Sequence, residues 1–214
     1  MKTPLLVLLL VWVICSAGCI THPDLTEFRQ SRPRSILVLP PLNDSTELAA
    51  SPCVLAALTR PLGEAGYYVM PVRLVDSYFR ENGLTVAGEI HQVPLQKLHE
   101  VFGADAVLYV HIKRFGLKYK VLMSDSTVEL DARLVDARTG IQIWKGHVVT
   151  SSGQTGVVEP LVFFLLSKAV IDEIHRESSA WASQLLVNSE EPRYYLPRGP
   201  WHPEFGRDLD GRPR

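Results

Sequence analysis

The stretch Ser35-Ile36-Leu37-Val38-Leu39-Pro40-Pro41 decides the fold of this chain. A continuous apolar run of strand length predicts a central strand covered on both faces, and the two prolines end it. Turn residues follow at 43–46, and then apolar side chains recur at helical spacing before Gly66. A second short strand at 67–72 completes a strand-helix-strand unit, which we expect to be parallel and right-handed.

The next part of the chain predicts two helices and an antiparallel meander. Helices are expected at 73–81 and 95–102, and strands at 106–112, 127–134 and 141–144. In 127–134 apolar and charged residues alternate, which is typical of a half-exposed antiparallel strand, and 136–140 has the composition of a hairpin turn. The predicted strand order starts at the residue 67 strand, continues through the residue 35 and residue 106 strands, and ends with the two hairpin partners.

The expected fold class is therefore α/β, with a mixed sheet of about five strands packed against helices. A long C-terminal helix is also expected after Pro160, because apolar residues recur there with a period near 3.6, at Phe163, Leu166, Val170, Ile174, Trp181 and Leu185. The single domain spans 35–188, and 189–214 is a tail rich in Pro and Gly. Its aromatic residues, among them Trp201 and Phe205, either dock on the domain or bind a partner.

Composition excludes several classes of protein. The 214 residues are 46% hydrophobic and 21% charged, which does not fit collagen or a disordered polyampholyte. The 22 Lys and Arg side chains nearly balance the 23 Asp and Glu, for a net charge of -1. No strong field therefore draws the whole protein to nucleic acid, and we expect no nucleic-acid partner.

The first 18 residues have the layout of a signal peptide. Lys2 precedes an apolar run, and Ser16-Ala17-Gly18 leads directly into Cys19. The run is shorter than the roughly 20 residues that cross a bilayer as a helix. The segment resembles the bacterial lipobox, which implies a diacylglyceryl group on the sulfur of Cys19 and an acyl chain on its amino group. Ile20 stands where Asp would retain a lipoprotein at the inner membrane, so the resemblance implies the outer membrane.

Residues 19–34 then form a polar, Pro-punctuated tether. Cys15 leaves with the signal peptide and Cys19 is acylated, so Cys53 has no partner for an internal disulfide. We expect Cys53 to be a small buried hydrophobic residue.

No motif predicts a catalytic or metal site, and no cofactor is expected. His99-Glu100 lacks the second histidine of a zincin because Gly103 occupies that position, and the seven histidines are scattered. Asn43, Asp44 and Ser45 are weak ligand-binding candidates at the carboxyl end of the central strand, with helix capping as the competing interpretation. Basic residues at Lys113, Arg114, Lys118 and Lys120 predict a short basic edge that discourages strand pairing, rather than a surface for nucleic acid or phospholipid.

Several stretches together resemble a family of bacterial lipoproteins of unknown function, known from genome-derived surveys for vaccine antigens. They are Phe28-Arg29, 33–43, Gly66-Tyr67-Tyr68-Val69, Asn82-Gly83-Leu84, 102–106 and Leu134-Val135-Asp136. The family is similar in fold to the amino-terminal domain of TolB and to the curli-secretion lipoprotein. The resemblance implies lipid attachment at Cys19, self-association and a place in an envelope transport, secretion or assembly system, facing the periplasm. It implies no catalytic residue.

Three hypotheses follow. The first is a non-enzymatic, lipid-anchored interaction module with an envelope protein as partner. The second is an envelope enzyme or small-ligand receptor that uses the loop at Asn43–Thr46. The third is a secreted soluble protein, whose location would not depend on Cys19.

Overall fold

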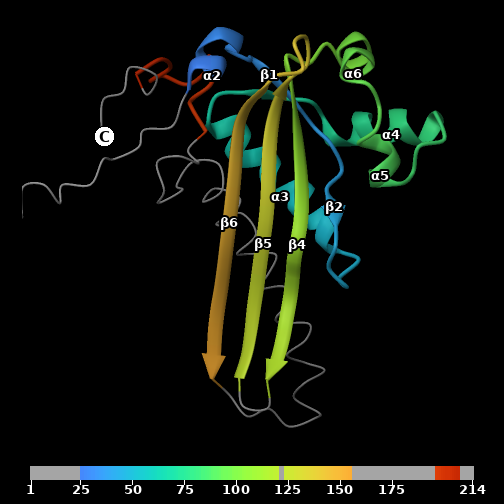
Figure 1. Cartoon of the computed structure of the whole chain (residues 1–214), viewed down its shortest axis with the longest axis vertical. Helices are drawn as coiled ribbons and strands as arrows, with labels where there is room; N and C mark the ends of the chain where they lie inside the picture. The colour runs from blue at the N-terminus through green and yellow to red at the C-terminus, as the bar shows by residue number, and fades with distance from the viewer. Residues whose placement is uncertain (1–24, 121–122, 156–195, 208–214) are drawn as a thin grey trace, which may run out of the picture.

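The computed structural model describes residues 25–120, 123–155 and 196–207, and its centre is a mixed six-stranded sheet (Figure 1). The strands are β1 (Ser35–Val38), β2 (Leu42–Asn43), β3 (Tyr68–Val69), β4 (Ala106–Lys120), β5 (Met123–Asp136) and β6 (Gln142–Thr155). The helices are α2 (Thr26–Ser31), α3 (Ala50–Glu64), α4 (Val72–Glu81), α5 (Ala87–Ile90) and α6 (Leu95–Phe102). The fold is therefore of the predicted α/β class.

The predicted strand order is confirmed. The sheet runs β3-β1-β4-β5-β6. Strand β1 is parallel to both β3 and β4, whereas β5 is antiparallel to both β4 and β6. One strand was not predicted: β2 pairs in parallel with β4, where Leu42 lies opposite His111. Two residues between turn signals are too short for a hydrophobic pattern to reveal.

Strand β1 is covered on both faces, as its apolar run predicts. Ile36 and Val38 point into one core with Val54, Leu58 and Leu62 of α3. Leu37 and Leu39 point into a second core on the other face of the sheet, with Val75 and Phe79 of α4. These side chains, three from β1 and that of Leu39 directly after it, are at most 2% exposed. The central strand therefore separates two hydrophobic cores.

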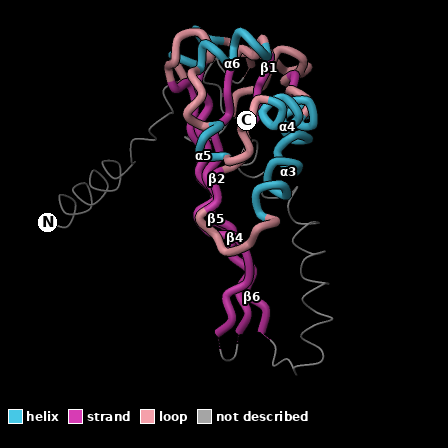
Figure 2. The backbone as a smooth tube through the Cα atoms, turned by 90° about the vertical axis from the view of Figure 1, so that its right-hand side faces the viewer, coloured by secondary structure: helices cyan, strands magenta, loops and turns pink. Residues whose placement is uncertain are grey.

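The meander is much longer than expected. Strands β4, β5 and β6 each run for 14 or 15 residues, and they extend away from the helices as an arm of three strands (Figures 1 and 2). The predicted alternation in β5 is confirmed, because Val128, Leu130, Ala132 and Leu134 are all buried. The basic residues were predicted to discourage strand pairing, and this is wrong for the edge of β4 that faces β5. Residues 114–120 of β4 pair continuously with β5, after a bulge at Lys113.

Segments near both ends of the chain pack on the domain. Part of the expected tether forms α2, whose Phe28 is buried in the first core together with Leu196 of the tail. The Tyr67 hydroxyl donates to the Pro197 carbonyl, so this part of the tail docks on its own domain. Trp201 nevertheless remains 73% exposed.

Other predictions lie outside the described residues: the signal peptide, Cys19 and the long helix after Pro160. In the part of the chain that is described, no helix is both long enough and apolar enough to cross a membrane.

Candidate functional site

An open groove of about 490 Å³ lies on one face of the meander. We call it the sheet-face groove. Strands β4, β5 and β6 form its floor, with Leu42 of β2 and His91, just after α5, at its border. Its ionisable lining residues are His91, Tyr109, His111, Asp131, Arg133, Lys145 and His147.

Strand register brings these residues together. His111 lies opposite Asp131, and Asp131 lies opposite His147, which makes one row across the three strands. Two residues further along β5, Arg133 lies between Tyr109 and Lys145 in a second row. Alternate residues of a strand share a face, so the buried Leu130 and Ala132 leave Asp131 and Arg133 on the groove side.

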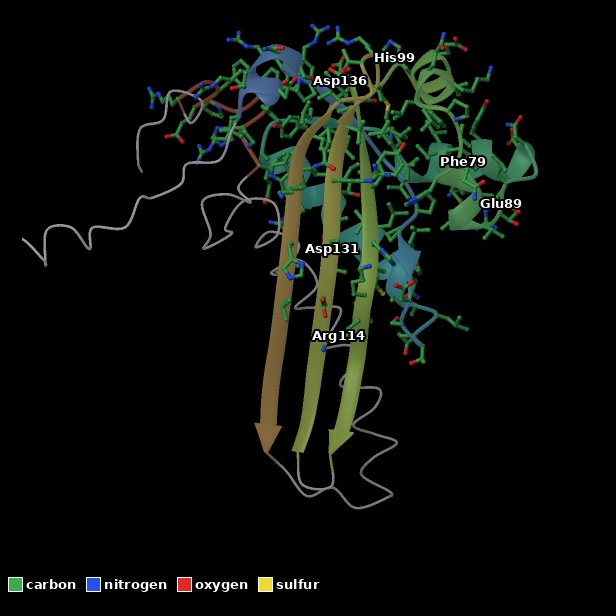
Figure 3. The ribbon with its side chains drawn as sticks, in the orientation of Figure 1. Phe79, Glu89, His99, Arg114, Asp131 and Asp136 are labelled. Carbon is green, nitrogen blue, oxygen red and sulfur yellow. The ribbon has the colours of Figure 1, made fainter. Side chains whose placement is uncertain are left out.

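Two histidines of the first row are held by carboxylates. The Nδ1–H of His147 on β6 donates to Oδ1 of Asp131 on β5 at 2.7 Å. Asp131 is labelled in Figure 3. The Nε2–H of His111 donates to Oδ2 of Asp44 at 2.7 Å. Each bond fixes the orientation of its imidazole ring. The bond at His147 uses Nδ1, so Nε2 lies at the edge of the ring that faces away from Asp131.

An aromatic residue holds the arginine of the second row. The guanidinium carbon of Arg133 lies 4.3 Å from the centroid of the Tyr109 ring, a cation–π contact. The His91 ring packs edge-on against Tyr109, with centroids 5.2 Å apart, and its Nε2–H donates to the Pro40 carbonyl. Burial raises the pKa of the Tyr109 hydroxyl, although the nearby Arg133 opposes this shift.

The electrostatics of the groove also act on His91. Burial lowers the pKa of His91, and the charges of Arg133 and His111 lower it further, while its bond to Pro40 acts in the opposite direction. His91 is therefore a neutral donor at neutral pH that supports the Tyr109 ring, and Arg133 and Lys145 supply the permanent positive charge of the groove.

The loop at Asn43–Thr46, predicted as a candidate site, borders this groove, but the polar groups of Asn43 bond within the loop and its flank. Asn43 Oδ1 accepts from the backbone N–H and the hydroxyl of Ser45, and its Nδ2 donates to the Glu47 carbonyl. These three residues do not cap α3, which begins after Ala49: the Ala49 amide donates to Oε1 of Glu47 at 3.2 Å, and not to Asn43, Asp44 or Ser45. Of the three candidates, only Asp44 reaches toward the groove, through His111.

The groove could not be predicted from the sequence, because its residues come together only through the register of three paired strands. Glu129, Asp131 and Arg133 share one face of β5, as the alternation in 127–134 predicts, and Glu129 pairs with Arg114 at 2.5 Å. A bulge between Leu134 and Val135 shifts the hairpin, so counting back from the turn would not have matched Asp131 with His147. The alternation of polar residues at 145 and 147 on β6 was the available signal.

Among the described residues, no group of three or more His, Cys, Asp or Glu side chains has the arrangement of a metal site. Cys53 packs against the first core and is only partly buried. Burial, with a smaller contribution from Glu47, raises the pKa of its thiol. A raised pKa reduces the thiolate fraction, so Cys53 does not have the character of an activated nucleophile.

Comparison with known proteins gives the family. Residues 23–193 match the family model described as "Putative lipoprotein GNA1162-like". The "Putative lipoprotein NMB1124/NMB1162" of Neisseria meningitidis serogroup B (strain ATCC BAA-335 / MC58) is 45% identical over 151 residues, which are 71% of this chain and 70% of that protein. The crystal structure of lipoprotein GNA1162 from Neisseria meningitidis aligns with a TM-score of 0.55 and 43% identity, over 67% of this chain and 99% of that one. The chain therefore belongs to the GNA1162-like family of lipoproteins.

Proposed function

We propose that this lipoprotein is anchored in the outer membrane through acylated Cys19, faces the periplasm, and serves as a non-catalytic component of an envelope transport, secretion or assembly system. This proposal rests on the arm formed by β4, β5 and β6. It extends beyond both hydrophobic cores, away from the helices that cover the rest of the sheet (Figure 2).

The arm has strand edges to which another chain can pair. Within the described ranges, β6 pairs only with β5, and β4 has no partner on its other edge beyond Ile112. Unpaired edges present rows of N–H and C=O groups, and addition of a strand is a common mode of protein association. These edges favour self-association or binding of an envelope protein over a solitary role.

The loop at Asn43–Thr46 offers less for the alternative function, a ligand receptor or enzyme. The polar groups of Asn43 already bond within the loop, and Asp44 bonds to His111. No specific observation on this loop points to a substrate.

Cys19→Ser tests the anchor. We expect the variant to leave the outer-membrane fraction and to lose the acyl groups from its N-terminal peptide by mass spectrometry, because two or more acyl chains supply the stable attachment. Cys53→Ser is the matched control and should stay in the membrane. A Cys19→Ser variant that still fractionates with the outer membrane would contradict the proposed anchor.

A photo-crosslinker tests the arm in cells. At Val149 of β6, which is 55% exposed, we expect adducts with a second copy or with an envelope protein. At Leu74 of α4, which is 66% exposed and far from the arm edges, we expect none. Absence of adducts at Val149, with the protein correctly anchored, would reject the arm as the interaction surface.

A further inference from the structure

We infer that the sheet-face groove binds a phosphate group, carried by a small ligand or by a lipid headgroup, through Arg133 and Lys145. This inference is independent of the membrane anchor and of the arm edges. It rests on the placement of the two cations, on the contacts that hold Arg133, and on the balance of charge in the groove.

The first step is the pairing of like charges. Arg133 and Lys145 lie directly opposite each other on β5 and β6, and both are exposed. Like charges directly opposite each other on antiparallel strands are destabilising. No ion pair joins either cation to a carboxylate among the described side chains, although Arg114, Arg138 and Arg80 each have one. An anion bound between the two would relieve the repulsion.

The second step is the support of Arg133. Its guanidinium lies over the Tyr109 ring, and Tyr109 is itself buried and held edge-on by His91. Stacking on one face of the planar guanidinium leaves the N–H groups at its edge available for a bidentate bond to an oxyanion. A side chain that is already positioned loses less entropy when it binds.

The third step is charge complementarity. The permanent charges that line the groove are Arg133 and Lys145 against Asp131, and the Oδ1 atom of Asp131 already accepts from His147. The groove is thus positive although the whole chain carries a net charge of -1. A phosphate monoester, at roughly -1.5 to -2, matches two cations, whereas a carboxylate or a phosphate diester would match one. This balance favours phosphate.

The test is the protection of Lys145 from acetylation. The full-length protein, in a nonionic detergent, is treated with an amine-acetylating reagent in rising concentrations of inorganic phosphate, and each modified lysine is measured by mass spectrometry. We expect phosphate to slow acetylation of Lys145 several-fold. Lys97 of α6, an exposed lysine outside the groove, should be unaffected. Sodium chloride at matched ionic strength controls for screening.

Variants assign the effect to the groove. Arg133→Gln should raise the phosphate concentration for half-protection of Lys145 by about tenfold or more, as expected for loss of a bidentate charged bond. Arg60→Gln on α3 removes the same charge elsewhere and should change nothing. Unchanged protection in Arg133→Gln, or no protection in the unmodified protein, would overturn the inference.

A second arm identifies the source of the phosphate. The protein is placed in lipid nanodiscs of phosphatidylcholine alone or with phosphatidic acid, whose headgroup is a phosphate monoester, without added phosphate. Protection of Lys145 that appears only with phosphatidic acid and is lost in Arg133→Gln means that a lipid headgroup enters the groove. Protection by inorganic phosphate alone, with none from phosphatidic acid, supports a soluble phosphorylated ligand. Failure in both arms rejects the site, whatever the outcome of the Cys19 and crosslinking experiments.

Discussion

Asp136 is the charged side chain that the fold buries almost completely within the described ranges, at 1% exposure. It sits at the end of β5, where its oxygens accept from Ser31 Oγ at 2.5 Å and from the backbone amides of Arg138 and Thr139 (Figure 3). Burial alone would raise the pKa of this carboxyl, but the hydrogen bonds outweigh burial and the pKa lies below its ordinary value. One residue thus ties α2 to the hairpin turn.

Asp136→Asn should lower the free energy of unfolding by about 2 kcal/mol at pH 7, because bonds to the charged carboxylate are lost. The folded pKa lies below the unfolded one, so the carboxylate stabilises the fold above about pH 3.9, and this stabilisation is lost as the pH falls through the folded pKa. Urea unfolding at pH 7 and in acid measures both effects. Asp76→Asn, an exposed partner of Arg80, should cost at most about 0.5 kcal/mol. An equal loss in the two variants would contradict this assignment.

At the scale of elements, α4 shows how one amphipathic helix closes the second core. Phe79 is 2% exposed and its ring contacts those of Tyr78 and Phe102, with centroids 5.9 and 5.7 Å apart. Leu74, on the same helix, is exposed. The sequence predicted α4 and α6 nearly to their ends, because each has a strong helical pattern that a glycine or Asn-Gly terminates.

Phe79→Ala should cost about 3–5 kcal/mol of unfolding free energy, because it removes buried contacts and leaves a cavity. Leu74→Ala is the matched control and should change stability by no more than about 0.5 kcal/mol. Urea unfolding at constant pH separates the two. If Leu74→Ala proved as costly as Phe79→Ala, α4 would have to pack through its other face.

For the whole molecule, docking of the tail depends on two close glycines. Gly66 has φ of +89°, and a Cβ there would lie 2.4 Å from the backbone nitrogen of His202. A Cβ on Gly199 would lie 2.2 Å from the Gly66 carbonyl oxygen. The amides of Gly199 and Trp201 donate to the carbonyls of Ala65 and Gly66. The tail can therefore approach the end of α3 only because neither Gly66 nor Gly199 has a side chain.

Gly66→Ala should release the tail and accelerate hydrogen exchange at the amides of Gly199 and Trp201, which lose their acceptors. Gly63→Ala makes the same chemical change three residues earlier, in α3, where a Cβ meets nothing within 4 Å. It should leave these amides protected and stabilise the protein by about 0.5–1 kcal/mol. Unchanged exchange in Gly66→Ala would show that the tail does not need the contact.

The sequence by itself determined the order of the five main strands, both faces of β1 and the alternation of β5. The burial of β1 and the alternation of β5 are local hydrophobic patterns, which depend on whether one or both faces of a strand are buried. The strand order follows from the short connections between neighbouring elements, a strand-helix-strand unit and a hairpin. Only the tertiary structure decided the length of the arm, because long paired strands need no special residue types once a neighbour supplies their hydrogen bonds. It also decided the sheet-face groove, since bulges at Lys113 and between Leu134 and Val135 shift the register that brings His111, Asp131 and His147 into one row.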